Sequence, residues 1–153
     1  MEYEWARLRA DELCKYAQDD TVVILPVAAL EQHGPHLPVM VDSRLAEEVS
    51  KRTASLGGDK GIPIITLPVV WHGLSEHHMP FGGTVTLTSN TFFLIVRDLI
   101  KSMSRHGFSK FLILNGHGGN ITAAEVCAQD ISMELSLPIL SLIHISEPTR
   151  LAT

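Results

Sequence analysis

Carboxylate and imidazole side chains gather in one short stretch of the chain, ALEQHGPHLPVMVD at residues 29–42. Glu31 and His33 are two residues apart, so in an extended segment both side chains face the same side. Asp42 returns at the start of the helix expected next, after a proline-containing loop. Oxygen and nitrogen ligands without a thiolate suit Zn²⁺ or Mn²⁺. A bridging carboxylate would hold two such ions, as in metal-assisted hydrolysis.

Each of these side chains also has an ordinary structural interpretation. Asp42 could simply cap the helix that is expected to begin there. His36, which precedes a Leu-Pro pair, is better interpreted as a hydrogen-bonding loop residue than as a ligand. Glu31 and His33 come directly after an apolar, strand-like run, and a purely structural role explains this pair less well.

A second cluster is the glycine-rich stretch NGHGGN at residues 115–120. His117 is its only metal-competent side chain, and the glycines let the backbone approach a ligand closely. A glycine-rich backbone that opens a helix is also typical of a phosphate site. The stretch lacks the lysine and the spacing of a Walker loop or a dinucleotide fingerprint. Taken alone, it leaves both a metal site and an anion site open.

A third cluster is HGLSEHHMPFGGT at residues 72–84. Its glycines and histidines predict a long functional loop rather than a regular element. We expect His77 and His78 to line the mouth of a pocket and Phe81 to form part of its wall. An ordinary surface loop is the alternative, and spacing alone makes none of these residues a metal ligand.

The elements that must position these clusters alternate along the chain. Apolar, β-branched runs predict buried strands at residues 21–28, 62–70 and 110–116, with a fourth beginning at 138–140. Helices are expected at 6–18, from Asp42 to about 55–61 with Asp42 or Ser43 as N-cap, at 89–107 with Ser89 or Asn90 as N-cap, and at 120–135. This alternation predicts an α/β fold with a parallel sheet covered by helices on both faces. Such sheets bind ligands beyond the carboxyl ends of their strands, where all three clusters fall.

Composition excludes several other classes. The 153 residues are 45% hydrophobic and 19% charged, as in an ordinary globular domain. A net charge of −5 and the lack of a basic run argue against a nucleic-acid partner. The sequence has no apolar signal core and no long apolar span, so we expect no membrane segment. Cys14 and Cys127 are interpreted as free thiols, which favours the cytoplasm.

The end of the chain carries a separate prediction. LSLIHISEPTR at residues 140–150 can be back-translated into a string that resembles a transposon adapter used for sequencing libraries. We therefore expect one domain over residues 1–140 and a non-native tail from adapter read-through over residues 141–153. A natural polar tail is the alternative. His144 and Glu147 are left out of the candidate site on this ground.

The three clusters, in this order, resemble the creatininase family of metal-dependent amidohydrolases, over about residues 5–140. The resemblance implies a three-layer α/β/α sandwich with a mostly parallel sheet, incomplete here at the C-terminus, and assembly into homo-oligomers, commonly hexamers. It implies two ions, Zn²⁺ and/or Mn²⁺, held by Glu31, His33, Asp42 and His117, with Asp42 bridging. It also implies a small-molecule amide substrate beside His77, Phe81 and Gly118. The implied reaction is hydrolysis of a non-peptide or cyclic C–N amide bond by a metal-bound hydroxide.

Two departures from the family pattern bear on activity. Creatininase has a glutamate ligand two residues after the histidine that matches His117, and this chain has Gly119 there. This argues against creatinine as the substrate. Relatives with NGHGGN use a glutamate in a later segment, which this sequence does not reach. We therefore expect one ligand and the general base beyond residue 140, and we assign no catalytic residue. A catalytically silent metal- or phosphate-binding domain is the alternative function.

Overall fold

Four apolar segments pair as parallel strands in the computed structural model of this protein, which describes residues 2–143. The strands are β1 (Val22–Val27), β2 (Ile64–Thr66), β3 (Lys110–Asn115) and β4 (Ile139–Ile143). The helices are α1 (Ala10–Gln18), α2 (Val41–Asp59), α3 (Ser89–Arg105) and α4 (Ile121–Leu135). Three short 3₁₀ turns, η1 (Trp5–Arg7), η2 (Glu76–His78) and η3 (Gly118–Asn120), complete the described elements. The expected α/β fold with a parallel sheet is confirmed.

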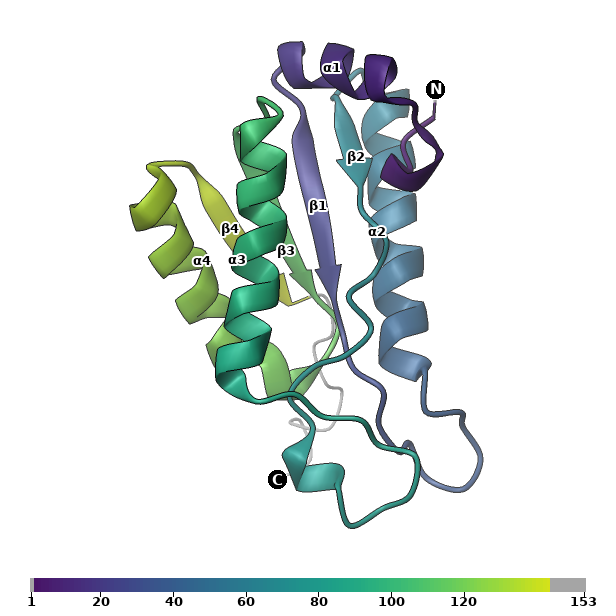
Figure 1. Cartoon of the computed structure of the whole chain (residues 1–153). Coiled ribbons are helices and arrows are strands. Elements are labelled where there is room, and N and C mark those ends of the chain that lie inside the picture. Colours follow the sequence, from purple (N-terminus) through teal and green to yellow (C-terminus); the bar gives the residue numbers. More distant parts are fainter. Residues whose placement is uncertain (1, 144–153) are drawn as a thin grey trace, which may run out of the picture.

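The strand order β2-β1-β3-β4 explains how the helices cover the sheet (Figure 1). The connection from β1 to β2 and the connection from β3 to β4 run outward in opposite directions. Right-handed crossovers therefore place α2 on one face and α3 and α4 on the other. The helices α3 and α4 pack against each other, and α2 packs on β1 and β2. The result is a three-layer arrangement with its strand order reversing between β1 and β3.

The main core lies between the sheet and the α3–α4 layer. Alternate residues of β1 point to this side, and Val23, Leu25 and Val27 are fully buried there. They pack in one cluster with apolar side chains of α3 and α4, among them Phe92 and Ile131. This burial fixes the position of β1 and β3, whose carboxyl ends carry the polar loops.

Several predicted boundaries were wrong in detail. Helix α2 begins at Val41, with Met40 at the N-cap position, so Asp42 lies in the first turn and is not a cap. Helix α3 is capped by Thr88, whose Oγ1 accepts a hydrogen bond from the Thr91 N–H, and not by Ser89 or Asn90. Strand β2 ends at Thr66, because the chain then leaves the ladder and returns to the sheet only at one bridge, between Val27 and Val70.

Strand β4 runs to Ile143, three residues past the domain boundary expected at residue 140. The rest of the expected tail, with His144 and Glu147, lies outside the described residues, and the adapter origin stays a prediction. Cys14 is exposed and Cys127 is buried, and neither forms a disulfide within the described part of the chain. Among residues 2–143, no helix is both long and apolar enough to cross a membrane.

Candidate metal centre

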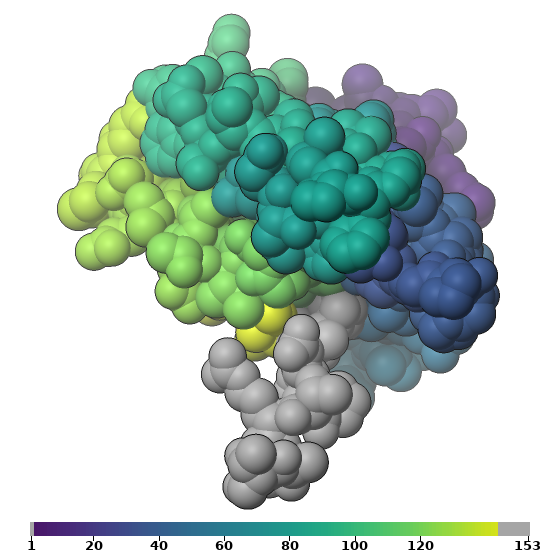
Figure 2. All heavy atoms as spheres, turned by 90° about the horizontal axis from the view of Figure 1, so that it is seen from below, coloured from purple at the N-terminus to yellow at the C-terminus, as the bar shows by residue number. Residues whose placement is uncertain are grey.

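The three polar loops meet at the carboxyl end of the sheet. They follow β1, β2 and β3, and they lie together at the lower end of the molecule in Figure 1, an end that Figure 2 views directly. Strands β1 and β3 are neighbours, with Val27 opposite Asn115 at their ends. Because the strand order reverses between them, this is the position at which open parallel sheets bind ligands.

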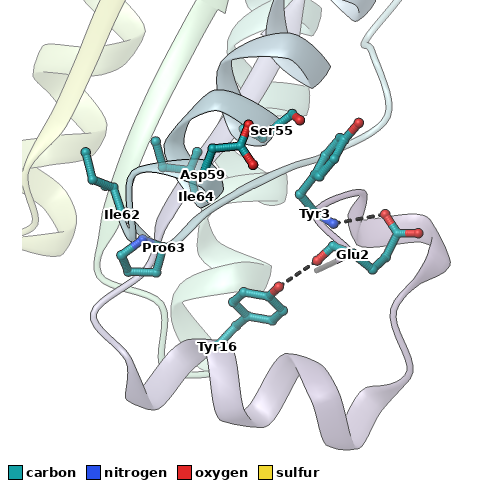
Figure 3. A pocket seen from close by; sticks show the side chains of 10 residues that line it. Glu2, Tyr3, Tyr16, Ser55, Asp59, Ile62, Pro63 and Ile64 are labelled. Atoms are coloured by element: carbon teal, nitrogen blue, oxygen red, sulfur yellow. Dashed lines mark hydrogen bonds between the residues drawn. The ribbon is translucent and has the colours of Figure 1, made fainter.

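Another pocket lies at the opposite, amino end of the strands (Figure 3). It is lined by α1, the end of α2 and the segment that leads into β2, and the Tyr16 hydroxyl donates to the Glu2 carbonyl oxygen across it, at 2.6 Å. Among residues 2–143, no histidine or cysteine lines this pocket. The residues that could bind a metal ion are therefore at the other end of the sheet.

Asp42 lies between two imidazoles and faces each with a different carboxylate oxygen. Its Oδ1 is 3.1 Å from Nε2 of His33, and its Oδ2 is 2.9 Å from Nδ1 of His117. The Asp42 and His117 side chains are buried, whereas the His33 side chain is partly exposed. A carboxylate placed in this way has the geometry of a bridge between two ion positions.

Glu31 supplies the second buried carboxylate. Its Oε2 lies 3.5 Å from Nε2 of His117, and its Oε1 lies 3.7 Å from Nε2 of His78. Within the described residues, Oε2 accepts no hydrogen bond, although it is buried. A buried carboxylate oxygen without a donor is costly unless a cation compensates it. This oxygen therefore favours a bound cation as the missing partner.

The ligand atoms form two overlapping groups. Glu31, His33 and Asp42 make up the first, and Glu31, His77 and His117 make up the second. In each group the ligand atoms lie within 4.8 Å of one another. The donors are carboxylate oxygens and imidazole nitrogens, which are the ligands of Zn²⁺ and Mn²⁺. The side chains present therefore fit two ion positions, and the two groups have Glu31 in common.

His117 is fixed by its own loop. The backbone N–H of His117 donates to Oδ1 of Asn115 at 3.0 Å, and Asn115 Nδ2 donates to the His117 carbonyl oxygen at 2.8 Å. Burial alone would lower the pKa of His117, but its hydrogen bond to Asp42 and the charge of Glu31 outweigh burial and raise the pKa. The raised pKa reflects a strongly negative pocket, which suits a divalent cation.

The contacts of NGHGGN do not support its interpretation as a phosphate site. The N–H groups of Gly116, His117 and Asn120 donate to the Val27 carbonyl, to Asn115 Oδ1 and to the His117 carbonyl. These three N–H groups are thus used inside the protein, and the two buried carboxylates beside them would repel an anion. The loop is built to hold the imidazole of His117 rather than to bind phosphate.

Two buried residues that sequence reasoning missed hold the loops together. Asn120 donates to the Ala28 carbonyl oxygen at 3.0 Å and accepts from the Leu74 N–H at 2.9 Å, so it joins all three loops. Ser75 is fully buried, and its Oγ lies 3.3 Å from Nε2 of His117. The polar ends of NGHGGN were a usable signal for Asn120, whereas nothing in the sequence marks Ser75 as different from other loop serines.

The residues expected beside a substrate are placed as follows. His77 is exposed and its ring stacks on that of His117, with centroids 6.1 Å apart. Phe81 is exposed, 6.0 Å from the His78 ring. Gly118 is exposed, with open space where a side chain would be. A pocket beside the cluster is lined by Leu74, Glu76, His77, the segment 86–89 and Gly119. His36 is exposed, outside both ligand groups.

Known proteins match this chain along most of its length. A family model described as creatinine amidohydrolase matches residues 6–150. The mycofactocin precursor peptide peptidase of Mycolicibacterium smegmatis is 35% identical over 103 residues, which are 67% of this chain and 41% of that protein. The creatinine amidohydrolase of Pseudomonas putida is 34% identical over 111 residues, 69% of this chain and 41% of that protein. The chain thus spans less than half the length of these two relatives.

Solved structures agree with the sequence matches. A crystal structure of creatininase superposes with a TM-score of 0.84 at 28% identity and covers 92% of this chain and 57% of that chain. Other solved creatininases include one described as Zn–Zn type and one described as a Mn form. With the family model across nearly the whole sequence and the same fold, the chain belongs to the creatininase family.

Proposed function

We propose that this chain carries a two-metal centre that hydrolyses a C–N amide bond. One observation carries the proposal: Asp42 faces His33 and His117 with separate carboxylate oxygens, next to a buried Glu31 oxygen that accepts no hydrogen bond within the described residues. The relatives' printed names, an amidohydrolase and a peptidase, support amide hydrolysis, and the Zn–Zn and Mn forms support the choice of ions. We further propose that the bond is non-peptide or cyclic and that the working protein is a homo-oligomer in the cytoplasm.

Some of the residues present would hold the ions, and others orient the side chains that hold them. Glu31, His33, Asp42 and His117 would hold the ions, and Asp42 would be shared. When bound, two divalent ions supply an activated water and a polarised carbonyl oxygen. The Leu74 carbonyl, 3.1 Å from His117 Nε2, and the amide of Asn115 fix the orientation of His117. Partners of this kind fix the ring orientation of a metal ligand, and losing one of them weakens metal binding.

The test compares metal content with turnover. The purified chain is loaded with Zn²⁺ or Mn²⁺, and bound metal is measured by elemental analysis. Hydrolysis is then assayed on a cyclic amide, a formamide and a short peptide. We expect two equivalents of metal, and any hydrolysis should fall on the cyclic amide or the formamide rather than on the peptide. Two bound ions without hydrolysis of any amide would favour the silent metal-binding domain, and a chain that binds no metal would refute the centre itself.

The first prediction concerns the shared carboxylate. Asp42→Asn keeps the size of the side chain but removes its charge, so both ions should be lost because one bridge serves both. Asp130→Asn, an exposed change on α4, is the matched control and should bind as the parent chain does. Retention of two equivalents of metal by the Asp42 variant would refute the bridging role.

A further inference from the structure

The two groups of ligand atoms are not equally buried. The group of Glu31, His33 and Asp42 has two buried carboxylates and one half-buried imidazole. On the other side, His117 and Glu31 would hold the second ion together with the shared Asp42. The remaining metal-competent side chain in that group is His77, from η2 in the loop between β2 and α3.

We propose that His77 is a further metal ligand, which joins Glu31 and His117 at the second ion position. The inference rests on the two-metal centre proposed above. The ligand atoms of these three residues lie within 4.8 Å of one another without any ion present. Small side-chain rotations would bring all three to the bonding distances of a zinc site, about 2.0–2.2 Å.

The loop that carries His77 is held in place on both sides. Ser75 N–H donates to Thr86 Oγ1 at 3.0 Å, and His78 Nδ1 is 2.8 Å from Nε2 of Gln32. The His77 ring packs on the His78 ring, with centroids 4.3 Å apart, and lies almost parallel to the His117 ring, at an interplanar angle of 7°. His77 is therefore placed by its neighbours rather than merely exposed near the site.

Position 119 cannot supply a ligand on this side. A Cβ at Gly119 would lie 2.2 Å from the Leu74 carbonyl oxygen and 2.4 Å from Nε2 of His117. Both distances are far below any real contact, so no side chain fits there without moving the loop or the imidazole. A side chain that joins Glu31 and His117 here comes from another loop, and among the described residues His77 is within reach.

The exposure of His77 also predicts how the two ions differ. His77 and Gly119 line the neighbouring pocket, so the second ion would face that pocket, while the first would be enclosed by Glu31, His33 and Asp42. An ion that faces the pocket exchanges more easily and keeps a position open for substrate. The second ion should therefore be the weaker and faster-exchanging one.

The experiment titrates the full chain with Zn²⁺ by calorimetry. The parent should show two binding events, and His77→Gln should keep one and weaken the other by at least ~100-fold, more than the loss of an outer partner costs. His77→Glu, which restores a ligand, should recover part of that affinity. His106→Gln, on the exposed residue that ends α3, is the matched control and should bind as the parent does.

A second readout reports ligation directly. In the Co²⁺-loaded chain, each bound imidazole gives a paramagnetically shifted ring N–H signal in proton NMR, and His77→Gln should remove one of them. Two binding events of unchanged affinity in His77→Gln, with no signal lost, would overturn the role of His77 and leave the two-metal centre standing. A parent chain that binds no Zn²⁺ would overturn both proposals.

Discussion

At the residue scale, Gly119 is confined more tightly than any side chain would tolerate. An added Cβ meets the backbone oxygen of Leu74 at 2.2 Å, whereas a Cβ at the adjacent Gly118 meets nothing within 4 Å. We expect Gly119→Ala to lower the free energy of unfolding by roughly 1–3 kcal/mol, the usual cost of overpacking. Gly118→Ala, the matched control, should stay within about 0.5 kcal/mol of the parent.

Urea denaturation of the metal-free chain measures both variants. Because no ion is present, a difference reports packing and not loss of metal. Equal unfolding free energies for the two variants would mean that Leu74 and His117 move aside at little cost. In that case position 119 could also hold a ligand side chain.

The sequence made some site residues predictable and others not. Glu31 and His33 were recognisable because an i, i+2 pair directly after a buried strand faces one side, and the structure brings them beside Asp42 and His117. The place of His77 was not predictable, because the loop at residues 72–84 has no regular period that would fix the direction of a side chain. Ser75 and Asn120 act through buried hydrogen bonds between loops, and sequence spacing does not encode such contacts.

At the scale of elements, strand identity followed from apolar runs, but boundaries depended on local contacts. The run at residues 62–70 is apolar throughout, yet only Ile64–Thr66 pairs with β1 in a continuous ladder. Ser43, an expected N-cap of α2, lies inside the helix, and its Oγ donates to the Ala29 carbonyl at 2.8 Å, which ties the helix to the end of β1. Tertiary hydrogen bonds of this kind override a cap preference.

Helices α3 and α4 are linked by an exposed group of charges. Glu134 on α4 accepts two hydrogen bonds from Arg97 at 2.7 Å and one from Lys101 at 2.9 Å, both on α3. The Arg97 and Lys101 bonds lower the pKa of Glu134 from 4.5 to about 2. A lowered pKa means that the contact stabilises the fold above pH 4.5 and that this stability is lost as the pH falls toward 2.

Glu134→Gln tests this linkage. The variant should melt below the parent near neutral pH, and the difference should shrink steadily from pH 5 to pH 2. Melting temperatures from circular dichroism across that range give the measurement. Glu125→Gln lies on the same helix, is exposed and has no ion pair among the described residues, so it should follow the parent at every pH. A pH-independent gap for Glu134→Gln would show that packing, not charge, links the helices.

At the scale of the whole molecule, the two faces of the sheet are covered unequally. The register aligns Ile24 with Leu112 and Leu140 across three strands, and Pro26 with Leu114 and Leu142. Helix α2 covers the β1 and β2 end of this face, while Leu140 is 69% exposed and Leu142 is 53% exposed. Within the described residues, β4 pairs only with β3, so an open strand edge borders the exposed leucines.

An apolar face beside an unpaired strand edge favours self-association. We therefore expect the chain to associate as its concentration rises, and Leu140→Thr with Leu142→Thr to reduce this association, because threonine removes apolar surface and keeps strand propensity. Sedimentation velocity over a series of concentrations measures the effect. Met133→Gln, on an α4 side chain that is 66% exposed, is the matched control and should associate like the parent. If the control reduced association as much as the double variant, the contact would not lie on β4, and general surface hydrophobicity would be the better explanation.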